Sequence, residues 1–102
     1  MEIMLVGDTF SAQEAYRIGL INYVVPAAQV MPKAEELARK IADNGPVAVR
    51  KLKETVLRAL SVSPEEGFQI ENESAREVLA SEDAKEGPRA FMEKRKPRYT
   101  GR

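Results

Sequence analysis

The chain has 102 residues, with 16 basic and 16 acidic side chains and no net charge. It contains no Cys and no His, which excludes disulfides, thiolate metal sites and a histidine general base. Its length fits one small domain with a modest core, or a piece of a larger one. No apolar run could span a bilayer and no signal-peptide pattern begins the chain, so we expect a soluble, cytoplasmic protein with no membrane or metal partner.

The first segment predicts a helix and then a strand. Ser11 and Glu14 have the spacing of a capping box at the start of residues 11–18, and Gly19 is suited to end that helix. Residues 20–25, LINYVV, are apolar and β-branched between a glycine and a proline, which indicates a short strand. No other segment predicts a strand to pair with it, so we expect it to pair outside this sequence.

The rest of the sequence predicts about four amphipathic helices. Apolar residues recur at three- and four-residue spacing, as on one face of a helix. The stripes are Val30, Ala34, Leu37, Ala38 and Ile41; Val49, Leu52, Val56 and Leu60; and Phe68, Ala75 and Leu79. Pro32 falls in a first turn, and residues 44–46, Asn-Gly-Pro, separate the first two helices. The stripes leave two alternatives open: a self-contained bundle, or an apolar face for a partner.

Two further helix starts are marked by serine. Ser63 and Glu66 form a second capping box with a proline between them, and Ser81 is suited to cap the last helix. Pro88 would lie inside that helix, where it removes a hydrogen bond and clashes with the preceding turn, so we expect a kink, or a break at residues 86–87. The sequence therefore predicts a mainly α chain: one helix and a short strand, then about four amphipathic helices.

The acidic pairs indicate no acid–base chemistry. They lie in first turns or on polar faces, where carboxylates serve solubility and the helix dipole. The pairs are Glu35 with Glu36, Glu65 with Glu66, and Glu82 with Asp83. No carboxylate is expected among apolar neighbours, where burial would tune its pKa for catalysis.

The chain ends in a basic segment, FMEKRKPRYTGR, at residues 91–102. It holds five basic residues and one acidic residue, so residues 1–90 carry a net charge of −4. A nucleic-acid-binding domain usually spreads positive charge over a whole face. One short basic patch on an acidic body therefore argues against a nucleic-acid partner.

Three segments resemble the enoyl-CoA hydratase/isomerase (crotonase) family in the right order. They are GDTFSAQEAYRIGLINYVVP, NGPVAVRKLKETV and SEDAKEGPRAFMEKRKPRYTGR, and with them the resemblance covers essentially all 102 residues. It implies the C-terminal part of a crotonase fold, a ClpP-like β-β-α spiral whose core is absent here. Residues 1–26 would end that core, and residues 27–102 would be a C-terminal helical oligomerisation region.

The resemblance implies acyl-CoA thioester chemistry through an enolate, for example hydration of trans-2-enoyl-CoA in fatty-acid β-oxidation. The oxyanion hole and the catalytic carboxylates would lie upstream, so we assign no catalytic residue to this chain and expect no turnover by it alone. The implied partners are the acyl-CoA substrate, with no covalently bound cofactor, and further copies of the chain, in a trimer or a dimer of trimers.

Two residues match binding positions of the family, Phe91 and Lys94. The resemblance puts the aromatic ring beside the acyl or pantetheine path and the ammonium near the nucleotide phosphates of CoA. A lysine suits a phosphate because a point charge needs no bidentate geometry. Their spacing of three predicts one side of a helix. The alternative is that Phe91 belongs to a core and Lys94 to the surface. Pro88 stands where the family more often has a branched apolar residue.

A second function class stays open beside the enzyme part. The chain could be a non-catalytic helical oligomerisation or adaptor module derived from the crotonase fold. The reaction type and the acyl chain would be determined by residues outside this sequence.

Overall fold

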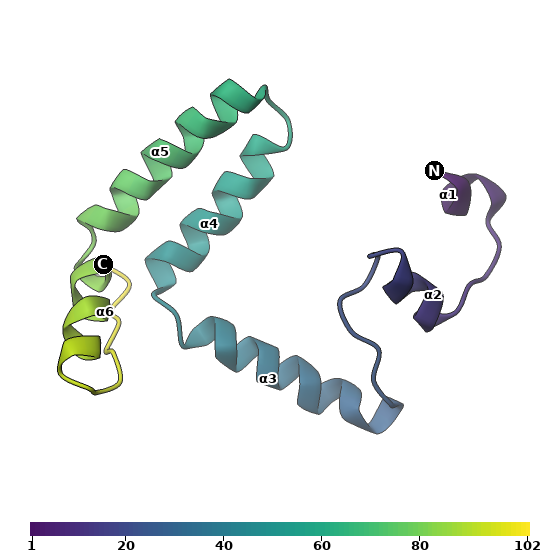
Figure 1. Cartoon of the computed structure of the whole chain (residues 1–102), viewed down its shortest axis with the longest axis horizontal. Helices are drawn as coiled ribbons and strands as arrows, with labels where there is room; N and C mark the ends of the chain where they lie inside the picture. Colours follow the sequence, from purple (N-terminus) through teal and green to yellow (C-terminus); the bar gives the residue numbers. More distant parts are fainter. The chain divides into compact units, whose positions relative to one another are not determined.

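The computed structural model describes all 102 residues, and it is helical without any strand (Figure 1). Its elements are α1 (Glu2–Val6), α2 (Ala12–Arg17), the 3-10 turn η1 (Ala27–Gln29), α3 (Val30–Ala42), α4 (Pro46–Ala59), α5 (Pro64–Ala80) and α6 (Glu82–Met92). The chain divides into two compact units, residues 1–36 and 37–102. None of the helices combines the length and the apolar content that a membrane crossing requires.

The first unit holds the short helices. Ser11 caps α2 by accepting a hydrogen bond from the Glu14 N–H at 3.1 Å, as predicted. The reciprocal half of the box is replaced, because the Glu14 carboxylate pairs with Arg17 instead. Gly19 follows with φ 76° and ends the helix in a Schellman motif: its N–H donates to Tyr16, and the Leu20 N–H donates to Ala15. Helix α1 was not predicted from the sequence.

The strand expected at residues 20–25 does not form. Its first two N–H groups, those of Leu20 and Ile21, donate instead to the Ala15 carbonyl, at 2.8 and 3.4 Å. The rest of the segment has no second strand to pair with, and a single strand cannot satisfy its own backbone groups. The β-branched composition of these residues is therefore not enough to make a strand within this chain.

The second unit is built on the antiparallel pair of α4 and α5, which lie side by side, with α6 packed on α5 (Figure 1). The predicted helix starts are confirmed: Pro46 and Pro64 each open a helix, and Ser63 with Glu66 completes both halves of its capping box. Ser81 caps α6 by accepting from the Ala84 N–H at 3.1 Å. Each of these signals acts within four residues, so it is visible in the sequence.

Pro88 does not break α6. The helix runs without interruption from Glu82 to Met92 with the proline inside it, so the expected break at residues 86–87 is wrong. The missing proline N–H removes one backbone bond, while the neighbouring turns are held from outside by the returning tail described below. The tail's bonds to Asp83 and Glu86 lie in the part of α6 that precedes the proline.

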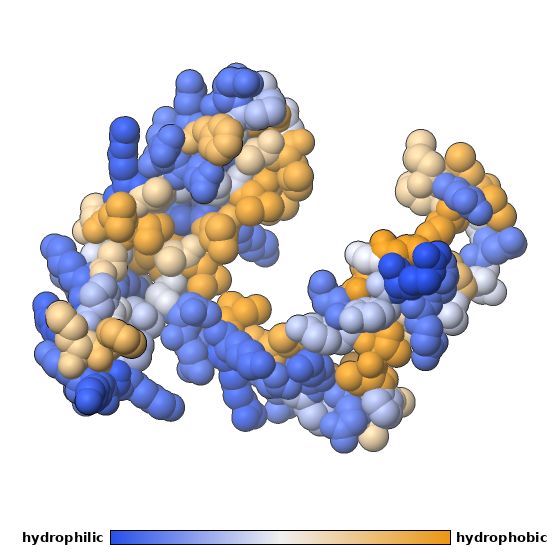
Figure 2. Space-filling view, in the orientation of Figure 1, coloured by the Kyte–Doolittle hydropathy of each residue, from blue (hydrophilic) through white to orange (hydrophobic).

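The chain has almost no apolar core of its own. Only Ala15 and Ala90 are buried apolar residues, and the remaining buried side chains are polar: Thr55, Ser74, Ser81 and Asp83. Stripe residues such as Leu52, Phe68 and Leu79 are two-thirds or more exposed. The expected modest core is therefore wrong for this chain, and apolar side chains gather instead on the surface of α4 and α5 (Figure 2). The stripes favour packing against a partner over a self-contained bundle.

Candidate functional site

Helix α6 ends in a tight turn that carries Lys94. Glu93 is the C-cap, and Lys94 follows with φ 52°, in the left-handed region. The Lys94 N–H donates to the Phe91 carbonyl at 3.1 Å, and the Arg95 N–H donates to the Ala90 carbonyl at 3.0 Å. This pair of bonds defines a Schellman motif. Because the helix has ended before Lys94, the predicted placement of Phe91 and Lys94 on one side of a helix is wrong.

Both predicted binding residues lie at the surface. The Phe91 side chain is 84% exposed, so it does not belong to a core within this chain. Lys94 is also exposed, and its ammonium has no acidic partner. The two residues are joined only through the backbone bond of the turn.

Glu86 holds the segment that follows Lys94. Its carboxylate accepts two bonds from the Arg95 guanidinium, at 2.5 and 3.0 Å, and one from the Arg98 N–H at 2.8 Å. These bonds favour the ionised form, and they lower the pKa of Glu86 to about 2. The Arg95 pKa is raised by its bonds to Glu86 and Glu93. The basic tail is therefore tied to α6 and is not a free arm.

Asp83 holds the end of the tail. It is 5% exposed, and its carboxylate accepts from the Thr100 N–H at 2.7 Å and from the Gly101 N–H at 3.0 and 3.2 Å. The Arg102 carbonyl in turn accepts from the N–H groups of Glu82 and Asp83, at 2.7 and 3.3 Å. The free N–H groups at the start of α6 are thereby satisfied.

The sequence did not predict this clamp. Asp83 was expected in a solvated first turn, whereas its side chain is buried under a tail that lies 17 and 18 residues further along. The available signal was charge complementarity between the acidic start of α6 and the basic end of the chain. A second signal was the glycine at position 101, which adopts φ 78°, a conformation that glycine takes without strain.

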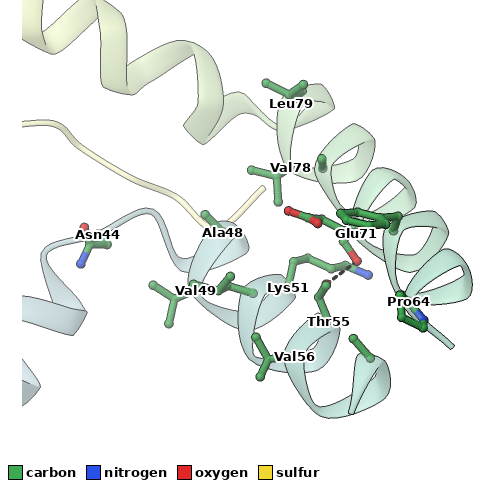
Figure 3. A pocket seen from close by; sticks show the side chains of 16 residues that line it. Asn44, Ala48, Val49, Lys51, Thr55, Val56, Pro64, Glu71, Val78 and Leu79 are labelled. Carbon is green, nitrogen blue, oxygen red and sulfur yellow. Dashed lines mark hydrogen bonds between the residues drawn. The ribbon is translucent and has the colours of Figure 1, made fainter. Parts of the chain in front are cut away.

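A groove of about 940 Å³ runs between α4 and α5 (Figure 3). Its walls are mostly apolar and include Val49, Val56 and Val78. At its floor, the Thr55 hydroxyl donates to the Ser74 hydroxyl at 2.6 Å, and both residues are buried. Lys51 reaches across from α4 to Glu77 of α5 at 2.5 Å, and this bond raises the Lys51 pKa. The groove offers apolar contact between two helices, with Lys51 and Glu71 among the residues that line it.

The comparison with protein families decides what these elements belong to. The sequence model of the family described as "Enoyl-CoA hydratase/isomerase" matches residues 1–102. The chain belongs to this family. The resemblance noted from the three sequence segments is thereby confirmed at the level of the family.

The chain is also similar in sequence to individual enoyl-CoA hydratases and related enzymes. The chain is 42% identical over 101 residues to the enoyl-CoA hydratase EchA19 of Mycobacterium tuberculosis, covering 99% of this chain and 38% of that protein. It is 44% identical over 105 residues to the carnitinyl-CoA dehydratase of Proteus mirabilis, covering 99% of this chain and 40% of that protein. The chain thus spans about two-fifths of the length of these relatives.

Solved structures agree on the fold. An enoyl-CoA hydratase from Mycobacterium tuberculosis superposes with a TM-score of 0.90 and 38% identity, over 96% of this chain and 39% of that chain. One from Bacillus anthracis gives 0.88 and 44% identity, over 91% of this chain and 36% of the other. The helices described above are therefore part of a crotonase fold. They match a minor share of each neighbour's length.

Proposed function

We propose that this chain is the C-terminal portion of an enoyl-CoA hydratase/isomerase, and that it contributes Lys94 to the binding of an acyl-CoA substrate. The observation that carries the proposal is the family match over all 102 residues, joined with an unpaired ammonium on a fixed turn. The proposed chemistry is that of acyl-CoA thioesters through an enolate, such as hydration of a trans-2-enoyl-CoA in cytoplasmic fatty-acid metabolism.

In this proposal the chain binds and positions but does not react. Lys94 meets a phosphate of CoA as a point charge, and Phe91 contributes an apolar surface along the acyl or pantetheine path. We assign the oxyanion hole and the catalytic carboxylates to other parts of the protein, so the isolated chain has no turnover. The apolar side chains over α4 and α5 support a homo-oligomer, with a trimer as the proposed state.

An exchange experiment tests the proposal. This chain replaces the matching segment of the enoyl-CoA hydratase EchA19, and the hydration of crotonyl-CoA is followed in the chimaera and in the isolated 102-residue chain. We expect activity in the chimaera and none in the isolated chain. Lys94→Ala in the chimaera should raise KM by about tenfold, because it removes a charge-assisted contact, while kcat changes much less.

Lys53→Ala is the matched control, since it removes an exposed lysine of α4 that has no ion pair. We expect it to leave KM unchanged. Hydration of crotonyl-CoA by the purified 102-residue chain would contradict the proposal that the catalytic groups lie in other parts of the protein. An unchanged KM in the Lys94→Ala chimaera would remove Lys94 from the binding site.

A second function is supported by the groove between α4 and α5. A helix pair with little core of its own and a largely apolar groove suits a non-catalytic oligomerisation or adaptor module. A properly folded chimaera that forms oligomers but hydrates no crotonyl-CoA would favour this alternative over the enzyme part.

A further inference from the structure

Lys94 occupies a position where a glycine is expected. Four residues of the chain have positive φ, and the other three are Gly7, Gly19 and Gly101. A side chain in the left-handed region crowds the following carbonyl, so a lysine there is less favourable than a glycine. Such an outlier persists only where the surroundings hold it in place, and it is a reason to look for a function.

The chain contains its own reference for this turn. Helix α2 ends in the same Schellman motif, with Gly19 at the left-handed position and the apolar Leu20 after it. Helix α6 has Lys94 and Arg95 at the corresponding positions, with the same two backbone bonds. The motif usually gains an apolar contact from the residue after the glycine. In α6 that residue is Arg95, and its contact is ionic.

The ionic contact is made by Glu86. This carboxylate lies on α6 before the turn, and it binds both the Arg95 guanidinium and the Arg98 N–H after the turn. Lys94 therefore lies in the chain between the end of α6 and a segment that is hydrogen-bonded back to α6, which restrains its backbone on both sides. Arg95 pairs with both Glu86 and Glu93, whereas the Lys94 ammonium has no acidic partner and sits on the backbone of this turn.

We propose that Glu86, acting through Arg95, is a positioning residue that holds Lys94 in its left-handed turn and thereby sets the affinity of its ammonium for a phosphate of CoA. The inference rests on the function proposed above for Lys94. Its physical basis is preorganisation: a lysine on a fixed backbone loses less freedom on binding than one on a mobile tail. Glu86 itself does not touch the ligand.

A double-mutant cycle tests the proposal by titration of the EchA19 chimaera described above with free CoA, while the φ of Lys94 is followed by NMR in the 15N-labelled 102-residue chain. The variants are Glu86→Gln, Lys94→Ala and the double variant. We expect each single variant to weaken CoA binding by about tenfold, and the double variant to bind no more weakly than Lys94→Ala alone. In Glu86→Gln, the HN–Hα coupling and the chemical shifts of Lys94 should also show that its φ leaves the left-handed region.

Glu14→Gln is the matched control, because it breaks the other carboxylate pair that holds an arginine through two bonds, the pair with Arg17. We expect it to leave CoA affinity unchanged. Arg95→Lys is a second variant for the same link: it keeps the charge and removes the planar fork, so it should reproduce the loss even if Glu86→Gln fails to fold.

Three results would overturn the proposal, and they are distinguishable. Unchanged CoA affinity in both Glu86→Gln and Arg95→Lys would show that the link does not position Lys94. A double variant about a hundredfold weaker than wild type would show that Glu86 acts independently of Lys94. An unchanged CoA affinity and KM in the Lys94→Ala chimaera would reject the proposed function of Lys94 itself, and would do so even if Glu86→Gln still changed the φ of Lys94.

Discussion

The left-handed turn at Lys94 lowers the stability of the folded chain locally, whereas the lysine side chain is proposed to bind CoA. A lysine with φ 52° is strained relative to glycine by about 1 kcal/mol. The same position in α2 shows the unstrained solution, since Gly19 makes the same two backbone bonds. Substitution by glycine would relieve the strain of the left-handed backbone at this position.

Lys94→Gly should therefore raise the free energy of unfolding by about 1 kcal/mol while it removes the ammonium from the turn. Urea unfolding followed by circular dichroism measures the change. Lys94→Ala is the control, because it removes the same charge and keeps a β-carbon in the left-handed region; it should give no such gain. A destabilised Lys94→Gly variant would show that the lysine is not under strain.

The Glu86 carboxylate should make docking of the tail depend on pH. Its pKa in the folded chain is about 2, below the ordinary value of 4.5, so the ionised form is favoured by folding. The corresponding stability is complete above about pH 4.5 and is lost as the pH falls toward 2. We expect the Arg98 amide resonance to report release of the tail over this window. Glu86→Gln should show no such transition, and a transition that persists in this variant would assign it to another carboxylate.

At the scale of the elements, polar bonds join α4 and α5 in addition to apolar contact. Thr55 and Ser74 form a buried hydroxyl pair between the two helices, while much of the apolar stripe around them stays exposed. A buried hydroxyl without a partner is more costly than an apolar group of the same shape. The pair therefore fixes how the two helices align.

Thr55→Val should destabilise the helix pair by about 1–2 kcal/mol, because it leaves the Ser74 hydroxyl without its partner. Ser74→Ala should have a similar effect for the reciprocal reason. The double variant should cost clearly less than the sum of the two, since no unpaired hydroxyl remains. Urea unfolding of the four proteins measures the coupling, and additive losses would mean that the two hydroxyls do not depend on each other.

The same scale shows how the tail becomes part of the fold. Asp83 and Glu86 are one turn apart on α6, and together they accept backbone N–H groups from residues 98, 100 and 101. The tail's peptide groups thus bond to carboxylates of α6 in place of water. Figure 1 shows the result, with the chain returning along α6 toward the start of that helix.

At the scale of the whole chain, many apolar side chains are exposed to water, which is unfavourable for the stability of the isolated chain. Side chains such as Leu52, Leu60 and Phe68 are 66% to 78% exposed, although their stripes have the pattern of a buried face. A surface of this kind is stabilised when a second protein surface covers it. We therefore expect the chain to associate with itself at high concentration.

Sedimentation should give a multiple of the chain mass of 11.4 kDa. Leu52→Glu, which places a charge on the groove, should shift the equilibrium toward the monomer. Lys53→Glu is its control, because it introduces the same carboxylate at the neighbouring residue, which does not line the groove. A clean monomer at high concentration would contradict self-association of this chain, and equal effects of the two variants would show that the groove is not the contact.

The sequence by itself determined what depends on neighbours within about four residues. It located the capping serines, the prolines that open α4 and α5, the glycine that ends α2, and the four amphipathic helices. Its three ordered segments also indicated the family, which the match over residues 1–102 confirmed. In each case the physical signal lies in adjacent residues, so no tertiary contact is needed to find it.

Only the tertiary structure decided the rest. It showed that residues 20–25 form no strand, that Pro88 stays inside α6, and that Lys94 lies in a left-handed turn beyond the helix. It also buried Asp83 beneath the basic C-terminal tail. The burial of Asp83 depends on partners 17 and 18 residues away, and residues 20–25 have no second strand to pair with. Local propensity cannot determine them, because the free energy of a contact between two distant segments depends on the residues of both.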